Sequence, residues 1–250
     1  MAVNIDLAYL MQPLVITIAS LLLVIYCYYK RTLTKWVFLY SFIAYFLAIA
    51  VKAVFQHFTI PLLASTGNLY YEGLYFGLQT VILEIGLAYV FAKYAISKKQ
   101  MSMKNASGYG IGLAFWENGV LLGIISMLNI LVIYSTIASG GPASAALYNG
   151  LLQTQPGLFL PASRAFVIIA LGTLERASSF ILHFAWGYIV LLAAFYRKRM
   201  YLAVALPMGL VDFIVVFVNV IGTVKFELIL FGIAMASLAI ALYIGSRKGR

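Results

Sequence analysis

The sequence predicts an all-α, polytopic membrane protein: a bundle of about seven transmembrane helices, with the N-terminus outside and the C-terminus inside. Three observations lead to this prediction. Hydrophobic residues make up 64% of the 250 residues and charged residues only 10%, which lies outside the range of soluble globular domains. Apolar runs of bilayer-crossing length recur along the chain. Most basic residues fall in alternate connectors between these runs.

The apolar runs account for nearly the whole chain, so we expect residues 1–250 to form one integral-membrane domain. The segment before the first run has no basic residue, so this run is expected to stay as a span and not to be cleaved as a signal peptide. The predicted spans are 7–29, 36–56, 69–94, 108–139, 165–196, 200–221 and 226–244.

The net charge of +10 is explained by membrane topology. Basic residues follow the first, third, fifth and seventh runs: Lys30, Arg31 and Lys35; Lys93, Lys98, Lys99 and Lys104; Arg197, Lys198 and Arg199; Arg247, Lys248 and Arg250. The other connectors hold only Arg164 and Lys225. The positive-inside rule places the basic connectors at the cytoplasmic face, against lipid headgroups, and we expect no nucleic-acid partner.

The connector 140–164 is the only long one. Glycine and proline pairs interrupt it, and we expect a short helix near residues 143–152 that caps the bundle on the outside. The chain has no detectable internal repeat, which weighs against an inverted-repeat transporter.

Four acidic residues lie near the middle third of their runs: Glu84, Glu117, Glu175 and Asp212. A charged side chain at this depth costs a few kcal/mol, so it needs a partner, a wet cavity or a function. Because the four lie at similar depth on different spans, we expect them to converge in one polar pocket. By contrast, Asp6, Glu72 and Glu227 lie at run edges and are expected to be interfacial, and Lys52 is expected to snorkel from the outer end of its run.

The fifth run contributes most of the polar residues of this predicted pocket. Arg176 and His183 are seven residues apart, nearly on one helical stripe, with Ser179 between them. Glu175 lies about 100° round the helix from Arg176, so it can face the same interior without pairing with it directly.

Two asparagines extend the predicted polar surface. Asn118 follows Glu117 between two small-xxx-small glycine pairs, which allow close helix packing. Asn219 lies seven residues after Asp212, which predicts one polar stripe on that helix.

These motifs resemble the YhfC-type intramembrane peptidases, distant relatives of the CAAX-processing and bacteriocin-processing glutamic membrane proteases. The resemblance runs through the third to sixth runs, and Glu175-Arg176 with His183 is its most specific part. Glu84-Ile-Gly86 resembles the family's Glu-Glu-x-Gly-Arg signature. Several positions depart from the family pattern: Leu83 and Leu87 replace the first Glu and the Arg of that signature, and Leu113 and Met208 stand where histidines are common.

The resemblance implies an endopeptidase of the glutamic type in a prokaryotic cell membrane, acting on membrane-embedded proteins or peptides. Glu84 or Glu117 would activate water with His183 as partner, and Arg176, Asn118 or Asn219 would donate hydrogen bonds to the developing negative charge. The sequence has no His-Glu-x-x-His motif and only His183 lies deep in a run. We therefore expect no metal, with a site of carboxylates and His183 as the alternative.

Three other hypotheses remain open at this point. A relative that has lost two histidines could have kept the fold and lost the activity. An accessory or structural subunit of a membrane complex would use the buried polar groups for assembly. A proton-coupled transporter would use the buried acids as proton carriers.

Overall fold

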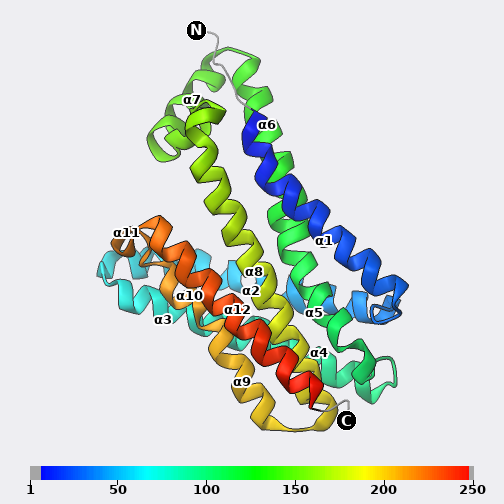
Figure 1. Ribbon diagram of the computed structural model, residues 1–250. Helices are drawn as coiled ribbons and strands as arrows, with labels where there is room; N and C mark the ends of the chain where they lie inside the picture. Colours follow the sequence, from blue (N-terminus) through cyan, green and yellow to red (C-terminus); the bar gives the residue numbers. More distant parts are fainter. Residues whose placement is uncertain (1–6, 248–250) are drawn as a thin grey trace.

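The computed structural model describes residues 7–247, which are almost entirely helical and contain no strand (Figure 1). Asp6, Lys248 and Arg250 lie outside the described residues. Six helices in the described part are long and apolar enough to cross a membrane: Leu7–Tyr29, Lys35–Thr66, Leu69–Ser97, Met103–Ala138, Ala162–Tyr196 and Thr223–Ser246. The prediction of an all-α, multi-pass membrane protein is confirmed.

Each of these long helices is one or more regular elements. The first long helix consists of η1 (Leu7–Leu10) and α1 (Met11–Tyr29), and the second is α2 (Lys35–Thr66). The third consists of α3 (Leu69–Gln79), the π-helical segment η2 (Thr80–Ile85) and α4 (Gly86–Ser97). The fourth consists of η3 (Met103–Asn105), α5 (Ala106–Ala114), the π-helical segment η4 (Phe115–Ile125) and α6 (Ser126–Ala138). After them come α7 (Pro142–Thr154), η5 (Pro156–Phe159), α8 (Ala162–Tyr196), α9 (Arg199–Gly209), α10 (Val211–Val215), α11 (Val218–Ile221) and α12 (Thr223–Ser246).

Helix α8 runs through the centre of the molecule, and its C-terminal half is buried against α4, α5, α9 and α12 (Figure 1). Small residues allow this close packing. A Cβ atom on Gly187 of α8 would lie 3.0 Å from the Cα atom of Gly110 on α5, so the two helices touch through their backbones. This contact holds the helix of Glu117 directly against the helix of His183.

The predicted span 200–221 is wrong as a single helix, because the structure divides it into α9, α10 and α11. Pro207 lacks the N–H that would continue the hydrogen-bond ladder, and α9 ends two residues later at Gly209. The β-branched residues that follow favour helix only weakly, and tight turns at Leu210 and Phe217 separate the short helices. Residues 7–247 therefore contain six long helices where the sequence predicted seven spans.

The connectors that carry most of the basic residues meet at one end of the molecule. The Asn105 side chain donates to the carbonyl of Thr32 at 3.0 Å, and the Tyr40 hydroxyl donates to Gln100 at 2.6 Å. The Tyr196 hydroxyl contacts the Met103 sulfur at 2.8 Å. The predicted helix near 143–152 is confirmed as α7, which lies at the opposite end, beside the start of α1 (Figure 1). The orientation of these two ends in a membrane stays a prediction.

Candidate functional site

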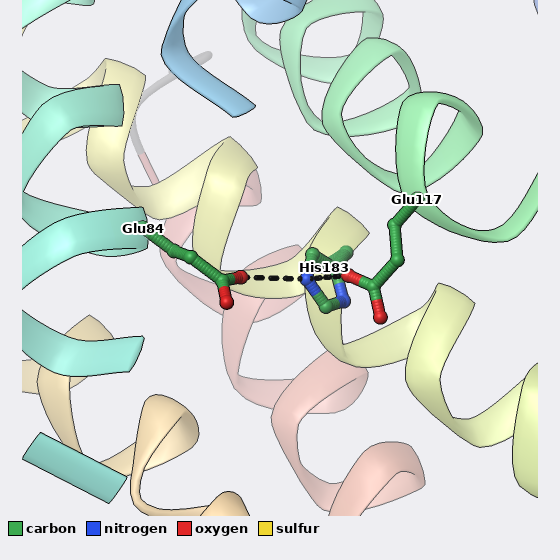
Figure 2. Close-up of side chains that lie close together, drawn as sticks. All are labelled: Glu84, Glu117 and His183. Carbon is green, nitrogen blue, oxygen red and sulfur yellow. Dashed lines mark hydrogen bonds and ion pairs between the residues drawn. The ribbon is translucent and has the colours of Figure 1, made fainter. Parts of the chain in front are cut away.

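The centre of the site is a histidine between two glutamates that come from three different helices. Figure 2 shows Glu84 from η2, His183 from α8 and Glu117 from η4 pointing toward one another. His183 Nε2 lies 3.1 Å from Glu84 Oε2 and also makes a close ion-pair contact with Glu117 Oε2. One ring nitrogen thus faces two carboxylates.

Both glutamates lie on π-helical segments. Glu84 is in η2 (Thr80–Ile85) and Glu117 is in η4 (Phe115–Ile125). A π-helical turn places an extra residue in the turn and re-aims the side chains around it, and such segments are frequent at functional sites. The apolar runs around these residues do not reveal the change in backbone hydrogen bonding, so the sequence predicts ordinary α-helices here.

The orientation of His183 is fixed by its own helix and by two aromatic rings. Its Nδ1 atom lies 2.9 Å from the carbonyl oxygen of Ser179. A carbonyl can only accept, so Nδ1 carries a proton and Nε2 is the atom presented to the glutamates. Trp186 and Tyr45 lie against the imidazole, with ring centroids at 5.1 Å and 6.4 Å.

Lys52 joins the site from α2 and is 9% exposed. Its Nζ atom makes a close ion pair with Glu84 Oε1 and donates to the Thr80 hydroxyl at 2.7 Å. The same nitrogen lies 3.9 Å from Asp212 Oδ2, which in turn accepts a hydrogen bond from Thr80. The Lys52 ammonium group therefore neutralises Glu84 at the carboxylate oxygen that does not face His183, and it also lies near Asp212.

These groups open onto a cavity of about 210 Å³. Ser179 lines the cavity and donates to Glu117 Oε1 at 3.1 Å. Glu175 and Arg176 line it as an ion pair. The polar residues around the cavity are Thr80, Glu84, Glu117, Glu175, Arg176, Ser179, His183 and Asp212. The expected convergence of the four acids with Arg176 and His183 is therefore found in the structure.

Two residues expected at the pocket are not brought to it. The Asn118 side chain is fully buried next to Glu117 and donates to its own helix at the Ala114 carbonyl, 3.3 Å away. Asn219 is exposed on α11, because the turn at Phe217 breaks the helical register that would have aligned it with Asp212.

Two expectations about charged residues are corrected, and a third residue, Glu227, is more buried than a run edge suggests. Glu175 and Arg176 do pair directly, because long side chains on adjacent residues can bend toward each other. Lys52 does not snorkel: α2 continues to Thr66, so Lys52 lies in mid-helix and turns inward. Glu227, near the start of α12, is 3% exposed, and its Oε2 atom has no hydrogen-bond partner among the described residues; its depth in a membrane stays a prediction.

One pattern in the sequence could have placed Lys52 at the site. Ser41, Ala44, Ala48 and Lys52 follow one another at helical spacing, and all four are buried in the structure. A stripe of small residues marks the face of a membrane helix that packs against its neighbours. Lys52 continues that stripe, which indicates an inward direction.

The Glu84–His183–Glu117 group has the composition of a metal site with three protein ligands. One ligand atom from each residue lies within 4.8 Å of the others. Because Nδ1 of His183 carries a proton, Nε2 can face two carboxyl groups if a proton lies on Nε2 or on one of the carboxyls, or if a cation is bound between them. Among the described residues that line the cavity there are four carboxylates and one fixed cation, Arg176, and Lys52 pairs with Glu84 from outside this lining. The donor set and the excess of negative charge both fit a divalent cation.

Comparisons with known proteins give one finding. The family model described as YhfC intramembrane metalloprotease matches residues 14–234, most of the chain and every residue of the pocket. Searches of curated proteins and of solved structures give no match. The matched region contains the π-helical segments, the buried ion pairs and the cavity described above. The chain therefore belongs to the YhfC intramembrane metalloprotease family.

Proposed function

We propose that the protein is an endopeptidase that cleaves membrane-embedded proteins or peptides, and that the reaction takes place at Glu84, His183 and Glu117. The observation that supports this function is an acid–histidine–acid group in a polar cavity between apolar helices. Hydrolysis inside a bilayer needs water, a group that accepts its proton and a donor for the oxyanion. On the same resemblance we propose a prokaryotic cell membrane as the location.

The donor set favours a metal-dependent form of the reaction. Glu84, Glu117 and His183 would hold a divalent cation, and three protein ligands leave a position for water. When bound, such a cation activates water and polarises a carbonyl. The chain's own residues prepare the ligands: the Ser179 carbonyl orients His183, and Lys52 holds Oε1 of Glu84 so that Oε2 faces the cluster.

Two further residues that line the cavity, Asp212 and Arg176, supply the remaining groups. Thr80 holds Asp212 Oδ2, which leaves Oδ1 to take a proton from water and to deliver it to the leaving amine. Arg176 lines the cavity and would donate to the oxyanion, while Glu175 fixes its guanidinium.

A metal-free, glutamic form is the second candidate, and Lys52 is the observation that favours it. The Lys52 ammonium already neutralises Glu84, so one proton on His183 Nε2 would complete the charge balance between the two glutamates. In this form Glu117, whose contacts are to Ser179 and His183, is the base, and Glu84 orients the histidine.

Metal content and cleavage together distinguish these forms. We expect purified protein to bind about one divalent ion per chain by elemental analysis and to lose it in His183→Gln. Cleavage of fluorogenic transmembrane peptides in liposomes should stop after chelation and return with metal. Cleavage by metal-free protein would establish the glutamic form. If the wild type, metal-loaded or not, cleaves no member of a broad peptide panel, the peptidase proposal fails in favour of an accessory subunit or a transporter.

A further inference from the structure

A second cavity of about 260 Å³ adjoins the candidate site on the other side of α10. Its walls come from α2, α3, α10 and the turn after α10. The lining residues are Lys52, Gln56, Phe76, Asp212, Val215 and Val216.

The two cavities share lining residues. Asp212 and Val215 line both of them, and Lys52 reaches from the second cavity to Glu84 at the cluster. The wall between them is the single short helix α10, Val211–Val215. An extended peptide advances about 3.3 Å per residue. A substrate side chain that binds in the second cavity therefore belongs to a residue close to a peptide bond held at the Glu84–His183–Glu117 group.

The chemistry of the second cavity selects an apolar occupant. Phe76, Val215 and Val216 provide apolar walls. Most polar lining groups already have partners: Gln56 Nε2 donates to Gln79 at 2.8 Å, Lys52 is held by Thr80 and Glu84, and Asp212 Oδ2 accepts from Thr80. A polar ligand would therefore find few free hydrogen-bonding sites in this cavity and would lose its hydration on binding. The volume is below the roughly 300–1,000 Å³ of pockets for whole small molecules, which suits one side chain.

We propose that this second cavity is a specificity subsite that binds one bulky apolar side chain, of the size of leucine or phenylalanine, next to the scissile bond of a membrane-embedded substrate. The proposal rests on the proposed peptidase function. Val216 and Phe76 are its specificity-determining residues, because they line this cavity and not the cavity of the cluster.

Two substitutions of opposite effect test the subsite. Val216→Phe fills the cavity, so kcat/KM for peptides with Leu or Phe beside the scissile bond should fall at least about 10-fold relative to matched peptides with Ala. Phe76→Ala enlarges it and should shift the preference toward Trp. Val220→Phe, on the exposed face of α11, is the control and should leave the preference unchanged. Unchanged preference in both cavity variants would overturn the proposal.

A binding experiment separates failure of the subsite from failure of the peptidase function. The probe is a synthetic transmembrane peptide that carries one photoreactive diazirine analogue of leucine, reconstituted with the wild type and with Val216→Phe. We expect crosslinks to Phe76 and to residues 211–216 in the wild type and their loss in Val216→Phe. Crosslinks without cleavage would retain the subsite and reject the peptidase. Cleavage without these crosslinks, or crosslinks only from a diazirine-labelled lipid, would reject the subsite and retain the peptidase.

Discussion

Lys52 is the residue on which the charge balance of the site depends. An ammonium group at the core of a membrane protein is stable only where acids neutralise it, and here Glu84 and Asp212 do so. The stabilisation is mutual, because without Lys52 the carboxylates of Glu84 and Asp212 lose their fixed positive neighbour. A buried ion pair adds little net stability, but the loss of one partner is costly.

We therefore expect Lys52→Met to destabilise the protein by about 3–5 kcal/mol, because it leaves Glu84 uncompensated. Lys52→Arg should retain more of this stability, since it keeps the charge. Thermal unfolding in detergent measures both variants, with Lys225→Met, at an exposed position, as the control. A Lys52→Met protein as stable as the control would show that Glu84 does not depend on Lys52.

Glu117 serves as a ligand in the metal-dependent form and as the base in the glutamic form. Glu117→Gln keeps the size and most hydrogen bonds of the side chain but removes its charge. Cleavage should fall by about 10² or more, while the unfolding temperature changes little. The control is Glu72→Gln in the first turn of α3, outside the pocket. Full cleavage by Glu117→Gln would exclude both roles, whereas unfolding of this variant would indicate a purely structural acid.

At the scale of the elements, α3 positions α10 and therefore Asp212. Gly73 and Gly77 form a flat face on α3, and Phe213 of α10 packs directly on it. A Cβ atom on Gly73 would lie 2.5 Å from the Phe213 carbonyl oxygen, too close for any real contact. The glycines thus allow the close approach that brings Asp212 to Thr80 and Lys52.

From this contact we expect Gly73→Ala to displace α10, with a loss of about 1–3 kcal/mol of stability and a clear loss of cleavage. Gly232→Ala on α12 is the matched control, because no atom lies within 4 Å of the added methyl group. That control should be neutral or stabilising by up to about 1 kcal/mol. Equal cleavage by the two variants would mean that the position of α10 does not matter to the site.

At the scale of the whole molecule, the two ends differ in charge. The connectors after α1, α4 and α8, which carry most of the basic residues, lie together at one end, and α7 lies at the other (Figure 1). Moving several lysines and arginines across a bilayer is unfavourable, so the basic end should stay in the cytoplasm.

Reporter fusions test this orientation. A fusion after Lys99 should report the cytoplasmic side and a fusion after Gly157 the outside. If both fusions report the same side, the proposed topology is wrong. A fusion after Ser246 tests whether the segment α9–α11 crosses the membrane. With the connector after α8 in the cytoplasm, α12 can end in the cytoplasm only if α9–α11 first carries the chain to the outside.

The sequence by itself determined the fold class, most of the spans and the set of acids that meet in the pocket. These features follow from local quantities. Apolar length decides which segments enter a bilayer, and the cost of burying a charge requires Glu84, Glu117, Asp212 and the Glu175-Arg176 pair to face inward together. His183 could be placed with them because one helix fixes its spacing from Arg176.

Only the tertiary structure decided which polar groups touch. The inward turn of Lys52, the burial of Glu227 and the exposure of Asn219 depend on which helix face meets a neighbour, and composition does not specify this. The division of 200–221 into three helices depends on whether packing against α3 and η2 offsets the hydrogen bonds lost around Pro207. The π-helical segments that aim Glu84 and Glu117 at His183 arise from a one-residue shift in backbone hydrogen bonding. Such a shift leaves no trace in an apolar run, because every residue there is compatible with either helix.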